Sequence, residues 1–294
     1  MRVAITGAAG LFGQGLVAAF STRHEVLPLT RAEADITDAE AVCAALERIR
    51  PELVVHPAGI PDLDVCEADP PKAFLVNYHG TRNVVEAARQ VGAGVAHIST
   101  DAVFDGKKLT PYLETDQPQP LTVYGATKLQ AEQAVKALAK HWIFRVSVLF
   151  GPGKTNFVEK GLRKVAAGDE YVVASDQLGT ATHTVDAGMK IMEVVEAGRC
   201  GLYHLSNQGA CTRFELARKA VELAGLDPGR VVGVPDVLMR RRVLRLKYAV
   251  MEMGALRQAG FALPRFWQDA LVEYVHAIKA LWEERSEDAA GLRS

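Results

Sequence analysis

The sequence predicts an α/β fold with a doubly wound parallel sheet, and three observations support this prediction. Short β-branched runs alternate with longer helical patterns in the first half of the chain, which is typical of βαβ units. A glycine-rich turn follows the first of these runs. Past residue 152 the alternation becomes irregular. We therefore expect a Rossmann-type domain over residues 1–152. A smaller, interleaved domain over residues 153–294 should return late strands and helices to the first.

Five strands of the parallel sheet are expected from their apolar, β-branched composition, at Arg2–Thr6, Glu25–Leu29, Leu53–His56, Val95–Ser99 and Ile143–Leu149. A helix should open near Leu11. Another should begin after Asp69, which can cap it, and run to about Val91 before Gly92. A third is expected over the good helix formers of residues 123–140.

Composition and charge exclude several classes of protein. The 34 Lys and Arg nearly equal the 35 Asp and Glu, so no overall field would attract nucleic acid or an anionic membrane. The eight histidines and four scattered cysteines show no metal-ligand spacing and no disulfide framework. The apolar start is too short for a signal peptide, and no long apolar run follows. We expect a cytoplasmic protein without a metal, with a homodimer as one open assembly.

The first glycine-rich turn has the context of a dinucleotide site. Gly7, Gly10 and Gly13 follow a strand directly and open a helix. Glycine lets the backbone turn sharply and approach a pyrophosphate, and the free N–H groups of a helix start attract the anion. The Gly-x-x-Gly-x-x-Gly spacing is typical of short-chain dehydrogenases, so a nicotinamide dinucleotide is the predicted cofactor.

The end of the second strand bears on which nicotinamide cofactor is used. NAD sites usually carry an acidic residue there, which binds the ribose 2′-hydroxyl. Here Arg31 occupies the region, and a guanidinium suits a 2′-phosphate better. NADP(H) is therefore favoured, with NAD(H) as the alternative because Asp35 lies nearby. A solvated surface charge is the other interpretation of Arg31.

Tyr124 and Lys128 are four residues apart in a helical segment, so they share one helical face. A nearby ammonium favours the phenolate, which would suit the tyrosine to acid/base chemistry, and Lys128 could also bind the nicotinamide ribose. Thr100 follows a strand at the carboxyl edge of the sheet, where ligands bind, and its hydroxyl could hold a reacting oxygen. Local backbone capping is the competing role for Thr100.

With these motifs, the sequence resembles the extended short-chain dehydrogenase/reductase superfamily, and within it the dTDP-4-dehydrorhamnose reductase family. The resemblance covers nearly the whole chain. Its pieces are Thr6–Gly13, Asp35–Asp38, Asn77–Asn83, Ser99–Gly106, Pro111-Tyr112 with Glu114 and Asp116, Tyr124–Lys128, Asn156-Phe157, Asp176-Gln177 with Gly179, and Gly260-Phe261 with Pro264.

The resemblance implies a role for each of these site residues. Thr100, Tyr124 and Lys128 would be the catalytic trio. The cofactor would be bordered by Gly7, Gly10, Leu11, Phe12, Gly13, Arg31, Asp35, Ile36, Ala58 and Gly59, together with Tyr124 and Lys128. The nucleotide-sugar substrate would contact Thr100, Asp101, Asn156 and Arg245. In that family the nicotinamide reduces a 4-keto sugar on a nucleoside diphosphate, and the tyrosine supplies the proton.

Three departures from the family pattern fall on the substrate side. Ala102 stands where the family usually has tyrosine, and Val148 where it has tryptophan. Thr180-Ala181-Thr182 replaces the common Ser-Pro-Thr. We therefore expect a keto-sugar reductase with an altered sugar pocket. The alternatives are a sugar-nucleotide epimerase or dehydratase that retains NAD, and a regulatory subunit that binds NADP without turnover, like the methionine adenosyltransferase β subunit.

Overall fold

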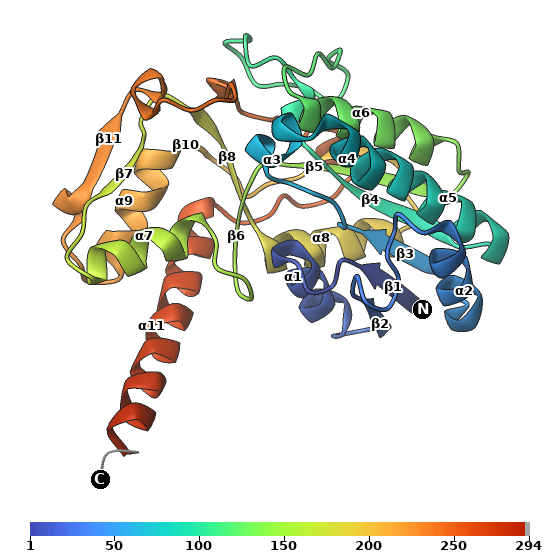
Figure 1. The fold of residues 1–294 in the computed structure, drawn as a ribbon, viewed down its shortest axis with the longest axis horizontal. Coiled ribbons are helices and arrows are strands. Elements are labelled where there is room, and N and C mark those ends of the chain that lie inside the picture. Colours follow the sequence, from blue (N-terminus) through green and yellow to red (C-terminus); the bar gives the residue numbers. More distant parts are fainter. Residues whose placement is uncertain (292–294) are drawn as a thin grey trace.

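The structure, a computed structural model, describes residues 1–291. Its first half alternates strands and helices as the sequence predicts (Figure 1). The elements are β1 (Arg2–Thr6), α1 (Leu11–Phe20), β2 (Glu25–Leu29), α2 (Ala39–Ile49), β3 (Leu53–His56), α3 (Leu63–Ala68), α4 (Pro70–Phe74), the π-helix η1 (Leu75–His79), α5 (Gly80–Val91), β4 (Gly94–Thr100), the 3-10 helix η2 (Asp101–Val103), α6 (Val123–Lys136), β5 (His141–Val146) and β6 (Val148–Phe150).

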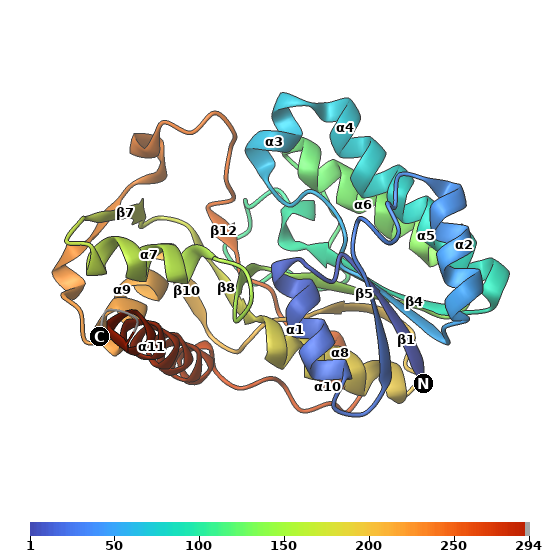
Figure 2. The ribbon, with the colours of Figure 1, turned by 60° about the horizontal axis from the view of Figure 1, so that its bottom comes forward.

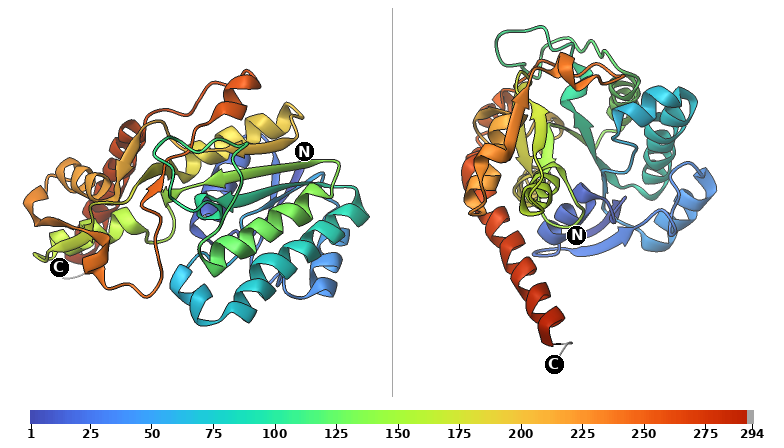
Figure 3. Two further views of the ribbon diagram at one scale, coloured as in Figure 1. Left: turned by 90° about the horizontal axis from the view of Figure 1, so that it is seen from above. Right: turned by 60° about the vertical axis from the view of Figure 1, so that its left-hand side comes forward.

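The second half contains α7 (Phe157–Ala166), β7 (Tyr171–Ala174), β8 (Leu178–His183), α8 (Thr184–Glu196), β9 (Gly201–His204), β10 (Ala210–Thr212), α9 (Arg213–Leu223), η3 (Pro228–Arg230), β11 (Val231–Val234), η4 (Asp236–Met239), β12 (Tyr248–Ala249), α10 (Gly254–Gln258) and α11 (Trp267–Gly291). The long helix α11 packs on α9 at its start and then runs away from the body of the molecule (Figure 3).

The main sheet is parallel and six-stranded, in the order β2-β1-β3-β4-β5-β9. Figure 2 shows α1 and α8 on one face and α2, α5 and α6 on the other. Each face is closed by its own apolar cluster, one joining the sheet to α1 and α8 and the other joining it to α2, α5 and α6. Both faces are therefore buried, which explains why the strands read as continuous apolar runs rather than alternating ones.

The expected strands Arg2–Thr6, Glu25–Leu29 and Leu53–His56 are confirmed, and Val95–Ser99 is confirmed within the longer β4. The single strand expected over Ile143–Leu149 is wrong. The extended segment is interrupted at Ser147 and forms two strands. β5 pairs with β4 and β9 in the main sheet, whereas β6 pairs with β8 in a second sheet. A run of apolar residues does not reveal that the chain changes sheets within it.

The helix expected from Asp69 to Val91 is present, with Asp69 capping it through a bond from the Lys72 N–H and Gly92 ending it in the left-handed conformation. It is interrupted by one π-helical turn, η1, which separates α4 from α5. The helix expected to reach residue 140 ends earlier, at Lys136. The residues after it make the turn that returns the chain to β5.

The second sheet is built around β8, which pairs with β6, β10 and β12, and a separate pair joins β7 to β11. A third apolar cluster packs α7, α9 and the start of α11 against these strands. The two halves of the chain interleave, because α8 packs on α1 and β9 adds to the edge of the main sheet beside β5. None of the described helices is long and apolar enough to cross a membrane.

Candidate active site

The glycine turn between β1 and α1 is closed so tightly that side chains would not fit. Gly7 has a φ of +58°, and a Cβ there would lie 2.9 Å from the Ala58 Cα. A Cβ on Gly13 would lie 2.2 Å from the Gly7 carbonyl oxygen. Gly10 is the N-cap of α1 and offers no side chain to bond the N–H groups of the first turn, which begins at Leu11, so these groups are left to a ligand or solvent. This geometry fits a pyrophosphate.

Arg31, Asp35 and Ile36 lie in the segment that follows β2. Because β2 pairs with β1 in parallel, this segment leaves the sheet at the same edge as the glycine turn. The Arg31 Nε lies 2.9 Å from an Asp35 carboxylate oxygen, and its side chain is 83% exposed. The backbone N–H and hydroxyl of Thr37 both donate to Asp35 and hold the pKa of its carboxyl below the usual range. Ile36 is buried against Gly80. Arg31 thus has a carboxylate partner but remains open to an added phosphate.

Ala58 and Gly59 follow β3, and Asn77 in η1 fixes this segment. The Asn77 carboxamide accepts from the Ile60 N–H at 2.7 Å and donates to the Ile60 carbonyl at 3.1 Å. It also donates to the Thr127 hydroxyl on α6. In the sequence, Asn77 stands out only as part of the family motif Asn77–Asn83. Its place shows that the π turn carries an amide that joins the β3 loop to the helix bearing Tyr124 and Lys128.

Tyr124 and Lys128 lie on the same helix, α6, but in different surroundings. Tyr124 is half-buried and lines a cavity, whereas Lys128 is only 4% exposed and its Nζ lies 3.0 Å from His97 Nε2. Burial raises the pKa of the Tyr124 phenol, and the nearby Thr100 hydroxyl lowers it in part. Burial lowers the pKa of Lys128 to about 7, against the opposing charge of Glu132.

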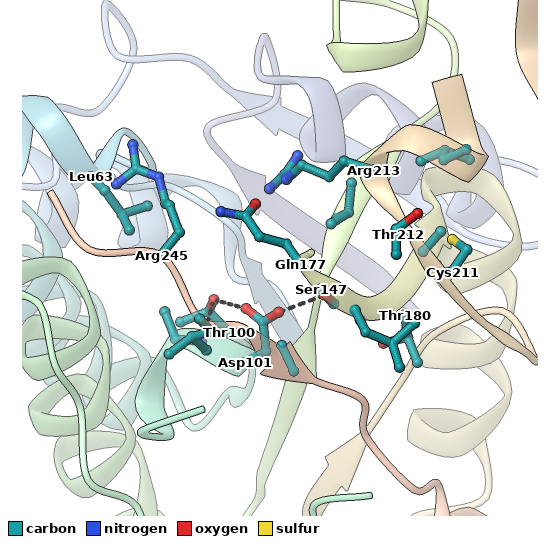
Figure 4. A pocket seen from close by; sticks show the side chains of 18 of the residues that line it. Leu63, Thr100, Asp101, Ser147, Gln177, Thr180, Cys211, Thr212, Arg213 and Arg245 are labelled. Carbon is teal, nitrogen blue, oxygen red and sulfur yellow. Dashed lines mark hydrogen bonds between the residues drawn. The ribbon is translucent and has the colours of Figure 1, made fainter. Parts of the chain in front are cut away.

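Thr100 is the last residue of β4, at the carboxyl edge of the sheet as predicted, and Asp101 begins η2 directly after it. The Thr100 hydroxyl donates to Asp101 Oδ1 at 3.0 Å and accepts from the Ala102 N–H. Asp101 Oδ2 accepts from the Ser147 hydroxyl at 2.5 Å (Figure 4). Burial raises the pKa of the Asp101 carboxyl, while the Ser147 and Thr100 hydroxyls lower it. Ser147, at the break between β5 and β6, thus ties the second sheet to the site.

One cavity brings most of the predicted substrate side together. It is lined from the first half of the chain by Leu63, Thr100, Asp101, Ala102, Tyr124, Ser147 and Val148, and from the second half by residues that include Gln177, Thr180, Ala181, Cys211, Thr212, Arg213 and Arg245. The lining therefore includes all four positions at which we expect departures from the family pattern, Ala102, Val148, Thr180 and Ala181. They lie far apart in the sequence, and the fold is what makes them neighbours.

Arg245 lies on the cavity wall, where it forms an ion pair at 2.7 Å with Asp64 of α3. Asn156 is not among the described residues that line the cavity. Its side chain caps α7 and donates to the Gly151 carbonyl and the Tyr274 hydroxyl. The carboxamide of Asn156 is therefore engaged in joining α7 to α11.

Arg213 is a cavity residue that the sequence analysis did not identify. It is the first residue of α9, and its guanidinium lies 5.3 Å from the centre of the Phe157 ring and points into the cavity (Figure 4). The Thr212 and Glu215 capping box marks this helix start in the sequence. Nothing in that local pattern, however, indicates that the helix start faces Thr100 and Asp101.

No group of His, Cys, Asp or Glu among residues 1–291 could hold a metal ion. The charged and polar groups that bear on the chemistry include those of Tyr124, Lys128, Thr100, Asp101 and the cavity arginines. Together with the glycine turn, this arrangement can bind a dinucleotide and protonate an oxygen held between Thr100 and Tyr124.

Comparison with known proteins places the chain among sugar-nucleotide enzymes. The family described as "RmlD substrate binding domain" matches residues 1–280. A dTDP-4-keto-6-deoxy-D-glucose reductase of Streptomyces niveus is 37% identical over 275 residues, which cover 92% of this chain and 96% of that protein. A dTDP-4-dehydrorhamnose reductase of Streptomyces griseus is 35% identical, over 94% of each chain.

The fold is also similar to that of a solved structure. The dTDP-4-dehydrorhamnose reductase of Bacillus anthracis, determined in complex with NADP, superposes with a TM-score of 0.90 and 33% identity. The match covers 93% of this chain and 98% of that one.

Proposed function

We propose an activity for this chain on the basis of its family, since it belongs to the RmlD substrate binding domain family. The chain is an oxidoreductase of the extended short-chain dehydrogenase/reductase type that uses NADPH to reduce a keto sugar linked to a nucleoside diphosphate. The observation that carries this proposal is the meeting of Thr100 and Tyr124 on one cavity, with the buried Lys128 four residues after Tyr124 on the same helix.

The cofactor would lie over the carboxyl edge of the main sheet, held by this chain's own groups. The first turn of α1, with Gly7, Gly10 and Gly13 as its close-packed base, would hold the pyrophosphate. Arg31 would bind the 2′-phosphate of NADPH, with NADH as the weaker ligand. Bound NADPH supplies the hydride that reduces the carbonyl carbon. Residues 1–152 would carry most of these contacts, and residues 153–294 most of those to the nucleotide sugar.

Tyr124 would donate its phenolic proton to the carbonyl oxygen as the carbon accepts the hydride, so that the ketone becomes an alcohol. The raised pKa of Tyr124 keeps the phenol protonated at neutral pH, which is the form an acid catalyst requires. Lys128 in its ammonium form would stabilise the phenolate left behind, which then takes a proton from solvent. Thr100 would hold the same oxygen with its hydroxyl.

The sugar pocket of this chain would differ from that of an ordinary dTDP-4-dehydrorhamnose reductase. Ala102 and Val148 leave the cavity with two small side chains where the family usually has aromatic ones, and both face the space beside Thr100. Arg245 would bind the diphosphate at the wall near α3. A bulkier or differently substituted keto sugar is therefore the expected substrate.

The test is to incubate the purified protein with NADPH and a panel of nucleotide keto sugars while the nicotinamide absorbance is followed. Reduction of one sugar with equal consumption of NADPH is expected. Tyr124→Phe should lower turnover by about 10² to 10⁴ while NADPH affinity persists, because only acid catalysis is removed. Ala102→Tyr should improve turnover of dTDP-4-dehydrorhamnose.

Three outcomes would contradict parts of this proposal. Conversion without net NADPH consumption would favour an epimerase or dehydratase, and NADPH binding without turnover of any sugar would favour a regulatory subunit. Full activity in Tyr124→Phe would overturn the catalytic role. Tyr203→Phe serves as the matched control, because its hydroxyl donates to the Arg199 carbonyl away from the cavity.

A further inference from the structure

A buried histidine of the main sheet contacts the side chain of Lys128, the proposed catalytic lysine. His97 lies in the middle of β4, at the centre of the main sheet, and is fully buried. Its Nε2 lies 3.0 Å from Lys128 Nζ. Its strand neighbours Ala96 and Ile98 point to the opposite face of the sheet, toward α1 and α8, so the His97 ring lies on the α6 side. A fully buried imidazole requires a hydrogen-bond partner to offset its lost hydration.

A second buried histidine provides a comparison within the same sheet. His56 on β3 lies with its ring centre 5.3 Å from that of His97. Its two nitrogens bond to the Thr6 hydroxyl at 2.7 Å and to the Thr81 hydroxyl at 3.0 Å. His56 is thus satisfied by structural hydroxyl groups. His97, in contrast, bonds to Lys128 through Nε2, and none of the described residues bonds to its Nδ1.

Burial, together with the groups near it, decides the protonation state of His97. Burial, the charge of Lys128 and the proximity of His56 all lower the pKa of His97, so its ring is neutral at physiological pH. A neutral imidazole accepts one hydrogen bond and donates one. If Nε2 accepts from the Lys128 ammonium, the ring proton must be on Nδ1.

We infer that His97 is a positioning residue that keeps Lys128 charged and aimed at the cofactor and Tyr124. An ammonium has three donors. His97 accepts a hydrogen bond from one of them, on the side of Lys128 that faces the sheet. The other two N–H groups then remain for the ribose hydroxyls of the cofactor and for Tyr124. This inference rests on the proposed function for the part played by Lys128 in the reaction.

The bond to His97 should raise the pKa of Lys128, because it is made most strongly to the charged form. Other groups also face this lysine. Glu132 on α6 raises its pKa, but Glu132 is itself paired with Arg145 of β5, and His56 lies beyond His97 on β3. Asp101 of η2 and Cys66 of α3 lie near enough to Tyr124 to raise the pKa of its phenol. Of these groups, only the His97 ring shares a hydrogen bond with Lys128.

The consequence has a definite sign. Reduction needs the ammonium form of Lys128, so activity is present below its pKa and is lost as the pH rises through it. Removal of the His97 acceptor lowers that pKa and moves the alkaline limb of the pH–rate profile to lower pH. A charge-assisted hydrogen bond corresponds to a shift of about one to two pH units.

The experiment compares three variants with the wild type. His97→Leu removes the acceptor, His97→Gln keeps one in the amide oxygen, and His56→Leu removes an equally buried imidazole that does not bond to Lys128. The pH profile of kcat/KM and the pH dependence of NADPH affinity are measured for each. We expect His97→Leu to shift the alkaline limbs of both profiles to lower pH. His97→Gln should keep both limbs close to their wild-type positions, and His56→Leu should not move them.

A second measurement needs neither turnover nor a variant. The ¹⁵N spectrum of the histidine rings in the wild-type protein without cofactor should show His97 neutral with its proton on Nδ1. A charged ring or a proton on Nε2 would overturn the inference, as would a His97→Leu profile that matches that of His56→Leu. Failure of the wild type to reduce any sugar would contradict the proposed function instead, while the ring spectrum and the NADPH affinities would still test His97.

Discussion

Arg31 is the residue expected to set the choice of nicotinamide cofactor. Its guanidinium is mostly exposed and bonds to Asp35 without being enclosed. A 2′-phosphate could therefore add to it without displacing a buried partner. Arg31→Ala should weaken NADPH binding by about one to two decades and leave NADH binding nearly unchanged, because a charge-assisted bond of about 1.5 to 3 kcal/mol is lost only with the phosphate.

The measurement is calorimetric titration of both cofactors into both proteins. Arg89→Ala is a suitable control, since Arg89 is also exposed and paired with a carboxylate, Glu86, but lies on α5 away from β2. Equal affinity of the wild type for NADPH and NADH would leave Arg31 as an ordinary surface charge.

The sequence indicated the residues proposed for the chemistry better than it indicated the residues that line the cavity. Tyr124, Lys128 and Thr100 could be singled out because their spacing and their place at a strand end carry a chemical meaning. Arg213 and Ser147 could not, because each reaches the cavity through packing between segments that are distant in the sequence. The contact of His97 with Lys128 was equally hidden, since a histidine inside an apolar run reads as a core residue.

At the scale of elements, α6 is anchored to the sheet by a buried ion pair. Both Arg145 Nε and Nη2 donate to Glu132 at 2.8 Å, and the two side chains are 2% and 0% exposed. Glu132 also accepts from the Ser99 hydroxyl. Glu132→Gln should lower the free energy of unfolding by about 3 to 5 kcal/mol, because it leaves the Arg145 charge buried without a counterion.

Urea denaturation measures this change. The matched control is Glu159→Gln, which breaks the more exposed Glu159–Arg163 pair on α7 and should cost about 0.5 kcal/mol or less. A similar small loss in both variants would mean that the buried pair contributes no more than a surface pair.

Element boundaries were predictable where local chemistry sets them. Asp69 and Gly92 mark the ends of a helical stretch because a capping carboxylate and a left-handed glycine act locally. The π turn at Leu75–His79 and the break at Ser147 are different. The π turn accommodates the contacts of Asn77 with the loop after β3 and with α6. The interruption at Ser147 moves the chain from the main sheet to the second sheet. Both depend on segments that are distant in the sequence, so neither has a local signal.

At the scale of the whole molecule, the main sheet depends on residues from the second half of the chain. β9 covers the edge of β5, and α8 buries apolar side chains such as Ile191 and Met192 against one face. A fragment of residues 1–152 would expose both the strand edge and that face. We expect it to lack a cooperative thermal transition by circular dichroism, in contrast to the full chain. A fragment that unfolded sharply near the full-length Tm would contradict this dependence.

The same interleaving affects how the protein is made. A ribosome delivers the chain from its N-terminus, and domains generally fold as units when their last residues emerge. Here the sheet that begins at Arg2 cannot be closed until Gly201–His204 has been synthesised. By then the first strands of the second sheet have also left the ribosome. The half-made chain therefore presents the open edge of β5 to chaperones from the synthesis of Val146 until β9 has emerged.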